Sequence, residues 1–193
     1  MSTPARYDTV ARLLHWLIVA LVIAQYAIGW TMPDVIVALV IAQYAIGWTM
    51  PDVHRDTQPI GLIAAHLLVG TALLAAMACR VLWRVTHRPP ASDLPPAMRA
   101  LSGATHFALY ALLIAVPLLG WINASSRAWS VTLLGIVPLP ALSAAGSAFG
   151  HAMGDVHGIL AWALFVGICL HVAAALAHRF VLRDQVMQRM MPW

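Results

Sequence analysis

An all-helical integral membrane protein is the fold class that this sequence predicts, and two observations carry the prediction. Hydrophobic residues make up 62% of the 193 residues and charged residues only 9%, which is far from the composition of a soluble globular domain. The apolar residues also form runs that are long enough to cross the hydrocarbon layer of a bilayer. We therefore expect a single membrane domain over residues 1–193.

Four apolar runs are long enough to span a membrane as helices. Each run is about 18 to 24 residues long, which as helix covers roughly 27 to 36 Å. The connection between the second and third runs is polar and contains Pro89, Pro90, Pro95 and Pro96, so neither helix is expected to continue through it. The sequence predicts a four-helix transmembrane bundle with spans at residues 13–30, 60–83, 105–122 and 156–177.

A tandem repeat separates the first two spans. Residues 18–35 read IVALVIAQYAIGWTMPDV, and residues 36–53 repeat them without a difference. The second copy could form a fifth span, lengthen the first helix, or lie outside the bundle. Its apolar run before Thr49, Met50 and Pro51 is only about 13 to 15 residues long, which is short for a span. We expect this copy at the outer surface of the membrane.

The distribution of arginines predicts the orientation, because cytoplasmic segments of membrane proteins are enriched in positive charge. The eleven basic residues are all arginine. Four spans and a cytoplasmic N-terminus place nine of them inside and only Arg55 and Arg127 outside. A fifth span would leave four inside and seven outside. Both termini are therefore expected in the cytoplasm.

Histidine is costly inside hydrocarbon and is usually functional there. His157 and His171 are 14 residues apart in the last span, which places them on one helix face about 21 Å apart along the axis. Ligands to a single ion lie about one turn apart, so one ion cannot use both residues. The spacing predicts two separate sites, one near each membrane surface.

Each site has a candidate partner histidine at the same depth. The first span runs outward and places His15 level with His171, whereas the second runs inward and places His66 level with His157. Two histidines on opposite sides of a haem iron leave no open coordination position, which suits electron transfer. The sequence therefore predicts two b-type haems, one with its iron held by His66 and His157 and the other by His15 and His171.

Other interpretations of the histidines are also open. His106 lies near the depth of His171 and could replace His15 as a ligand. His178, with Arg179, could bind a quinone head group or could be an ordinary interfacial residue. Any single membrane histidine could instead bond to a neighbouring helix, and a haem-free transporter could use histidines as a proton relay.

Four glycines could let a flat macrocycle approach the helices, namely Gly70, Gly120, Gly158 and Gly167.

Several short motifs occur in an order that is more specific than any one of them. R-x-x-H-W occupies residues 12–16 and Q-Y-x-x-G-W residues 25–30; R-V-L-W-R ends the His66 helix, and H-R-F-V-L-R-D follows His171. With one copy of the repeat set aside, nearly the whole chain resembles the prokaryotic cytochrome b561 family, four-helix di-haem cytochromes of the bacterial inner membrane. The resemblance implies haem b ligation by the four histidines paired above and electron transfer between membrane quinone and a small redox partner.

The resemblance also implies a substrate pair, because a relative in this family is similar to a superoxide oxidase. We expect a superoxide:quinone oxidoreductase that passes electrons from periplasmic superoxide to ubiquinone, with Arg55 and Arg127 attracting the anion. The alternative is a cytochrome b anchor subunit that passes electrons from a partner hydrogenase or dehydrogenase to quinone. In either case the expected partners are membrane lipid, the quinone pool and a redox donor, and not nucleic acid. The repeat departs from the family, since it adds 18 residues between His15 and His66.

Overall fold

The structure is a computed structural model that describes residues 31–54, 56–86 and 95–183. Predictions on His15, on Arg55, on the span at residues 13–30 and on the two termini lie outside these residues. Within the described part, four helices are long and apolar enough to cross a membrane, which confirms the all-helical membrane fold class. They are Thr31–Thr49, α2 (Leu62–Thr86), α3 (Pro96–Ser126) and α4 (Ala148–Ala177), and α4 continues into the π-helix η1 (His178–Leu182).

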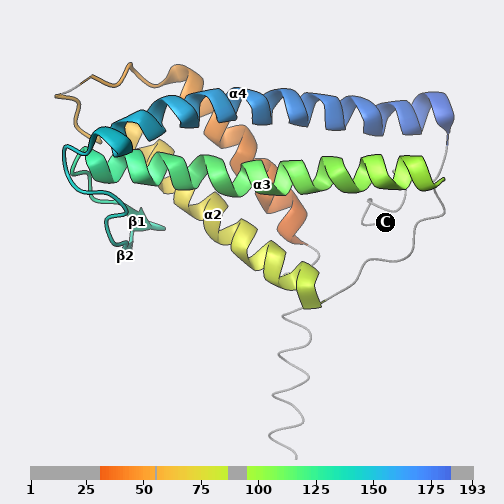
Figure 1. The fold of residues 1–193 in the computed structure, drawn as a ribbon, viewed down its shortest axis with the longest axis horizontal. Coiled ribbons are helices and arrows are strands. Elements are labelled where there is room, and N and C mark those ends of the chain that lie inside the picture. Colours follow the sequence, from red (N-terminus) through yellow and green to blue (C-terminus); the bar gives the residue numbers. More distant parts are fainter. Residues whose placement is uncertain (1–30, 55, 87–94, 184–193) are drawn as a thin grey trace, which may run out of the picture.

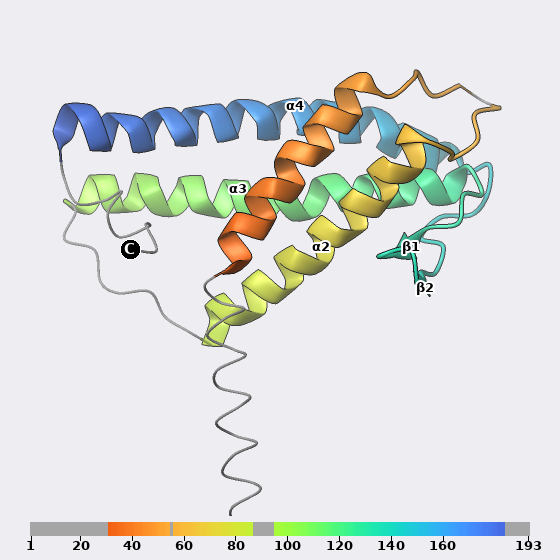
Figure 2. The same cartoon turned by 180° about the vertical axis from the view of Figure 1, so that it is seen from behind.

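Two pairs of helices make up the bundle. Helices α3 and α4 pack antiparallel along the long axis of the molecule (Figure 1). The Thr31–Thr49 helix and α2 cross this pair obliquely and leave it toward the end where α3 begins (Figure 2). The four helices therefore meet at the end where α4 begins, and only α3 and α4 continue together to the other end.

The second copy of the repeat lies inside the bundle, so the expectation that it lies at the membrane surface is wrong. The Tyr44 hydroxyl donates to the Ala161 carbonyl of α4 at 2.7 Å, and the Gln43 amide donates to His66 of α2. The helix reaches a spanning length of 19 residues because it already includes Thr31 and Pro33 of the first copy. A proline in a first turn is tolerated, and Pro51 limits the other end.

Helices α3 and α4 both begin earlier than the hydropathy of the sequence indicates. Helix α3 starts at Pro96 rather than near residue 105, because a proline at the first helical position loses no intrahelical hydrogen bond. Helix α4 starts at Ala148 rather than near residue 156, and the Ser147 side chain caps it by accepting from the Gly150 N–H at 3.2 Å. His151, which precedes the predicted span at residues 156–177, therefore lies in the first turn of α4.

A short β-hairpin lies between α3 and α4 and packs on α2. Strand β1 (Thr132–Leu133) pairs antiparallel with β2 (Val137–Pro138), and Gly135 takes a left-handed φ of 73° at the turn. The Thr71 hydroxyl of α2 donates to the Thr132 carbonyl at 3.0 Å. This bond holds the hairpin against the middle of α2.

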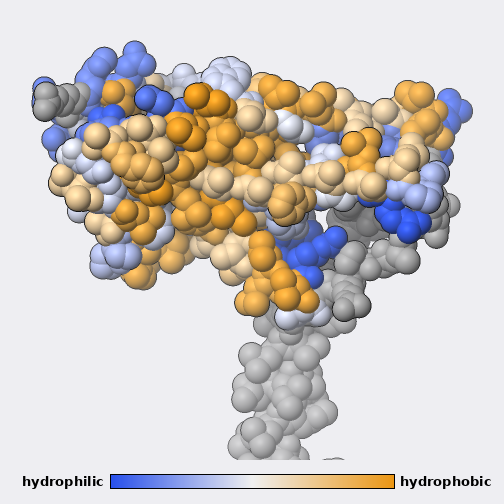
Figure 3. Space-filling model, viewed as in Figure 1, coloured by the Kyte–Doolittle hydropathy of each residue, from blue (hydrophilic) through white to orange (hydrophobic). Residues whose placement is uncertain are grey.

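The outer surface of the helices is apolar, as a lipid-facing surface must be. Phe107, Ile159 and Leu170 are 75%, 67% and 66% exposed. Apolar residues cover most of the visible face in Figure 3, and hydrophilic ones gather toward its ends. Few large side chains are buried, so the helices are held together by close backbone approach and polar contacts more than by a large core.

Candidate functional site

His66 of α2 and His157 of α4 face each other where the four helices meet. Their ring centroids are 6.0 Å apart and their planes are inclined by 80°. A metal–imidazole bond of about 2 Å puts a metal ion about 3 Å from each ring centroid, so two rings on opposite sides of one ion have centroids about 6 Å apart. The separation of this pair therefore matches two axial ligands of one ion.

The His157 ring is oriented by α3. Its Nδ1–H donates to the Val116 carbonyl at 2.8 Å, which leaves Nε2 as the nitrogen that can bind a metal. Gly120 makes room for the ring, because a Cβ built there would lie 3.1 Å from His157 Cε1 and Nδ1. The position and the tautomer of His157 therefore both depend on one turn of α3.

The surroundings of His66 leave polar atoms without partners. The Gln43 amide N–H donates to His66 Nε2 at 3.0 Å, and so takes the lone pair that a metal ion would use. Among the described residues, Gln43 Oε1 and His66 Nδ1 are buried with no hydrogen-bond partner. Such atoms are uncommon in native proteins and indicate a missing partner. A bound group that displaces Gln43 from Nε2 would let both side chains reorganise.

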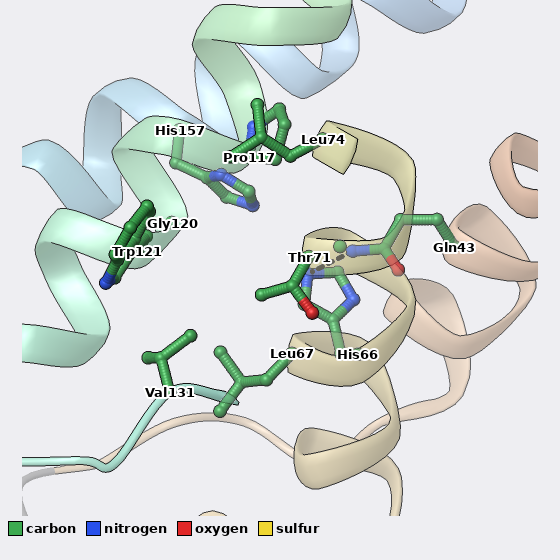
Figure 4. Close-up of a pocket in the computed structure, with 11 residues that line it drawn as sticks. Gln43, His66, Leu67, Thr71, Leu74, Pro117, Gly120, Trp121, Val131 and His157 are labelled. Carbon is green, nitrogen blue, oxygen red and sulfur yellow. Dashed lines mark hydrogen bonds between the residues drawn. The ribbon is translucent and has the colours of Figure 1, made fainter. Parts of the chain in front are cut away.

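Two cavities adjoin the histidine pair. The larger measures about 220 Å³ and lies between all four helices, with apolar walls that include Leu73, Val116 and Leu164. The smaller measures about 30 Å³ and lies between α2 and α3, where Leu67 and Val131 close one side (Figure 4). Both cavities adjoin the histidine pair, because they share five lining residues: Gln43, His66, Gly70, Pro117 and His157.

This donor set restricts the kind of metal group that fits. No group of three or more His, Cys, Asp or Glu side chains suited to a metal ion occurs in the described ranges, whereas a catalytic zinc site uses three protein ligands. Two histidines beside an apolar slot fit a metal whose other positions are filled by a flat macrocycle. Of the glycines that the sequence singles out, Gly70 and Gly158 line the larger cavity, and Gly167 packs against Leu109.

A second histidine pair lies farther along α4. The ring of His171 is 5.2 Å from that of His106 of α3, with the planes inclined by 78°. The His106 Nδ1–H donates to the Ser102 carbonyl at 2.7 Å. The structure thus brings to His171 the histidine that the sequence offers as a competitor, while the predicted partner His15 is not among the described residues.

The remaining predicted residues lie near the two ends of the bundle. Arg127, at the end of α3, donates through Nε to Asn123 Oδ1 and through Nη1 to the His54 carbonyl, each at 3.1 Å, and its guanidinium stacks over Trp129. His178 and Arg179 begin η1, directly after α4. Arg127 is therefore held in place at one end, and the other two follow His171 at the opposite end.

Sequence reasoning overlooks two polar contacts of these sites. The Gln43 contact with His66 could not be assigned, because Gln25 is an identical candidate in the first copy. Arg80 of α2 donates to the Tyr110 hydroxyl of α3 at 3.1 Å. The second contact has a signal in the sequence, because Arg80 is a charged residue within an apolar run and needs a polar partner there. We used Arg80 only to predict orientation.

Comparison with known proteins identifies the family of this chain. A family model described as prokaryotic cytochrome b561 matches residues 6–193. The chain is 30% identical to "Cytochrome b561 homolog 2" of Escherichia coli K12, covering 98% of this chain and 93% of the relative. It is 29% identical to "Probable superoxide oxidase CybB" of Yersinia pestis, with 93% and 92% covered, and 26% identical to "Cytochrome b562" of Cereibacter sphaeroides, with 99% and 98% covered.

The match extends over nearly the whole chain, and the described residues include four helices that are long and apolar enough to cross a membrane. The chain therefore belongs to the prokaryotic cytochrome b561 family, the haem b electron-transfer proteins that cross the bacterial inner membrane several times.

Proposed function

We propose that this chain transfers electrons from a periplasmic donor to ubiquinone through two haem b groups. The observation that carries the proposal is the His66–His157 pair, 6.0 Å apart beside an apolar cavity. His171 would hold the second haem, about 21 Å from His157 along α4. For the second ligand at His171, the sequence predicts His15 and the structure places His106 nearby.

The residues around the first pair suit electron transfer. Haem b, when bound, supplies an iron that gains and loses one electron. His66 and His157 would both hold the iron, an arrangement that suits electron transfer rather than oxygen chemistry. The Val116 carbonyl keeps His157 in the tautomer that presents Nε2, and His66 lines the same mainly apolar cavity.

We propose superoxide as the donor and ubiquinone as the acceptor. Two superoxide anions lose one electron each and become dioxygen, and ubiquinone takes up these two electrons with two protons to become ubiquinol. The superoxide proposal is supported by the relative whose name is probable superoxide oxidase. It is also supported by Arg127, which lies six residues, about 9 Å, beyond Trp121 at the wall of the smaller cavity.

Arg127 would attract superoxide only over a short distance. Asp52 and Asp56 lie in the connection between the Thr31–Thr49 helix and α2, and Asp155 lies near the start of α4. All three are toward the same end of the bundle as Arg127, so a broad positive field is not available there. A held guanidinium close to the site can still raise the local concentration of a small anion. Arg55 would add to the effect of Arg127, and His178 with Arg179 would bind the quinone head group at the opposite end.

The test uses the full chain in vesicles that contain ubiquinone. We expect a reduced-haem absorption band, and ubiquinol formation when superoxide is generated outside, both diminished in His157→Ala. Arg127→Gln should slow the superoxide-dependent rate several-fold and Arg127→Lys much less, with the difference shrinking at high salt. Absence of a haem band would disprove the proposal. Quinone reduction that needs a co-purifying hydrogenase or dehydrogenase would assign the chain as that enzyme's anchor subunit.

A further inference from the structure

Gln43 and His66 meet between two helices that glycines allow to approach closely. On the Thr31–Thr49 helix Gly47 lies one turn after Gln43, and on α2 Gly70 lies one turn after His66. A Cβ on Gly70 would lie 3.3 Å from Gln43 Nε2, and a Cβ on Gly47 would lie 3.6 Å from His66 Cε1. Each polar side chain therefore lies against a glycine of the opposite helix, and the amide and the ring are confined to the same small space.

The direction of the hydrogen bond between them determines the tautomer of His66. An amide N–H can only donate, so His66 Nε2, which lies 3.0 Å from Gln43 Nε2, is the acceptor. The ring proton is then on Nδ1, as it is in His157, whose Nδ1 donates to the Val116 carbonyl. Both histidines of the pair therefore keep their lone pair on Nε2, the nitrogen that a metal would use.

His66 differs from His157 in what its Nδ1–H can reach. The two buried side-chain atoms that lack a hydrogen-bond partner in the described part of the chain are His66 Nδ1 and Gln43 Oε1. One is a donor and the other an acceptor, and they belong to side chains that already face each other (Figure 4). A histidine that binds a metal almost always donates its other N–H to a carbonyl, a carboxylate or water. Gln43 carries the carbonyl that lies nearest at hand on the Thr31–Thr49 helix.

We infer that Gln43 is a positioning residue of the His66–His157 site, and that its side-chain carbonyl accepts from His66 Nδ1–H when Nε2 is bound to iron. With Nε2 bound, the Gln43 amide N–H loses its acceptor there. The two ring nitrogens are separated by a single carbon, so a small rotation of the two side chains brings Oε1 to Nδ1. This inference rests on the proposed function, since it takes haem iron as the metal.

The bond gives Gln43 an influence on electron transfer as well as on ring orientation. Donation from Nδ1–H raises the basicity of the imidazole toward the metal. A more basic ligand stabilises the oxidised iron, which carries the greater positive charge, and so lowers the reduction potential. Gln43 would therefore do for His66 what the Val116 carbonyl does for His157.

The test is a redox titration of the purified full-length chain with its haem, followed by visible absorption. Gln43→Leu removes the acceptor and should raise the potential of one haem while that of the other stays constant. Haem affinity at that site should fall about 10–100-fold. Gln43→Glu supplies a stronger acceptor and should lower the potential of the same haem. Gln25→Leu, a change of the identical residue in the first copy, is the matched control and should leave both potentials unchanged.

Gln43→Glu also covers the case in which Gln43→Leu does not fold, since it keeps the length and the polarity of the side chain. A residue that only stabilises the fold would not shift the potential in opposite directions in the two variants. Potentials in Gln43→Glu equal to those of the unaltered chain would overturn the inference. A shift in Gln25→Leu with none in the Gln43 variants would also overturn it. An unaltered chain without haem would instead refute the proposed function.

Discussion

At the scale of single residues, two backbone carbonyls of α3 determine which ring nitrogen of His157 and of His106 keeps a free lone pair. Val116 accepts from His157, and Ser102 accepts from His106. A neutral imidazole that donates through Nδ1 keeps a lone pair only on Nε2. One helix therefore fixes the tautomers of two histidines at different depths.

Gly120→Ala should weaken haem binding at the His66–His157 site. The added Cβ would lie 3.1 Å from two atoms of the His157 ring, and the ring cannot move without straining its bond to Val116. Overpacking of this kind costs about 1–3 kcal/mol. Titration of the purified apoprotein with haem would measure the loss of affinity.

Gly103→Ala is the control for that experiment, since it lies on the same helix and a Cβ there meets nothing within 4 Å. It should bind haem at the His66–His157 site as the unaltered chain does, and gain up to about 1 kcal/mol of helix stability. Equal haem affinity in both variants would mean that the position of His157 does not depend on Gly120.

At the scale of elements, the Thr31–Thr49 helix is held by polar and aromatic contacts. The Trp48 ring packs edge-on against Phe165 of α4 at 5.2 Å, and the Tyr44 ring lies 5.4 Å from the same phenylalanine. Together with the Tyr44 hydroxyl bond to Ala161, these contacts hold the helix against α4. The two contacting residues of this helix, Tyr44 and Trp48, have identical counterparts 18 positions earlier in the sequence, Tyr26 and Trp30.

Tyr44→Phe should destabilise the protein more than Tyr26→Phe. The first change removes the 2.7 Å bond to the Ala161 carbonyl, which is worth about 1 kcal/mol. The second removes the same hydroxyl from the first copy, and so serves as a control of identical chemistry. Unfolding in detergent gives the two free energies. A larger effect of Tyr26→Phe would mean that the first copy packs in the bundle.

Deletion of residues 36–53 should leave a folded protein that keeps the His66–His157 haem. Eighteen residues are five whole helical turns, so Gln25 and Tyr26 can take the positions of Gln43 and Tyr44. His15 then replaces Pro33. In the shortened chain, His15→Ala should remove one haem, as measured by haem content. A shortened chain without the first haem would show that the copies are not interchangeable.

At the scale of the whole molecule, the arginines distinguish the two ends of the bundle. Arg84 lies in the last turn of α2 and Arg99 near the start of α3, while Arg179 and Arg183 follow α4. Because α2, α3 and α4 alternate in direction, these residues reach one side of the membrane. Arg127, between α3 and α4, reaches the other.

A reporter fused to the C-terminus should therefore lie in the cytoplasm. Positive charge is retained on the cytoplasmic side during insertion, so a green fluorescent protein fusion should fluoresce and an alkaline phosphatase fusion should be inactive. The reverse pair of results would invert the topology and would place Arg127 on the cytoplasmic side, away from any periplasmic anion.

Local properties of the chain account for what the sequence predicts well. Hydropathy and run length are enough for the helical membrane fold, and α4 alone sets His157 and His171 at different depths, because helical rise and phase do not depend on neighbours. Helix starts are less predictable, since the caps at Pro96 and Ser147 lie in segments without a strong apolar signal.

Only the tertiary structure decides that the second copy of the repeat packs against α2 and α4 and that His106 lies beside His171. Identical copies have identical propensities, so only contacts with α2 and α4, such as Tyr44 with Ala161, can separate them. His106 lies beside His171 because α3 and α4 remain packed where the other helices diverge. The sequence determines that α4 carries His157 and His171 at two depths, and long-range packing determines which described histidines lie beside them.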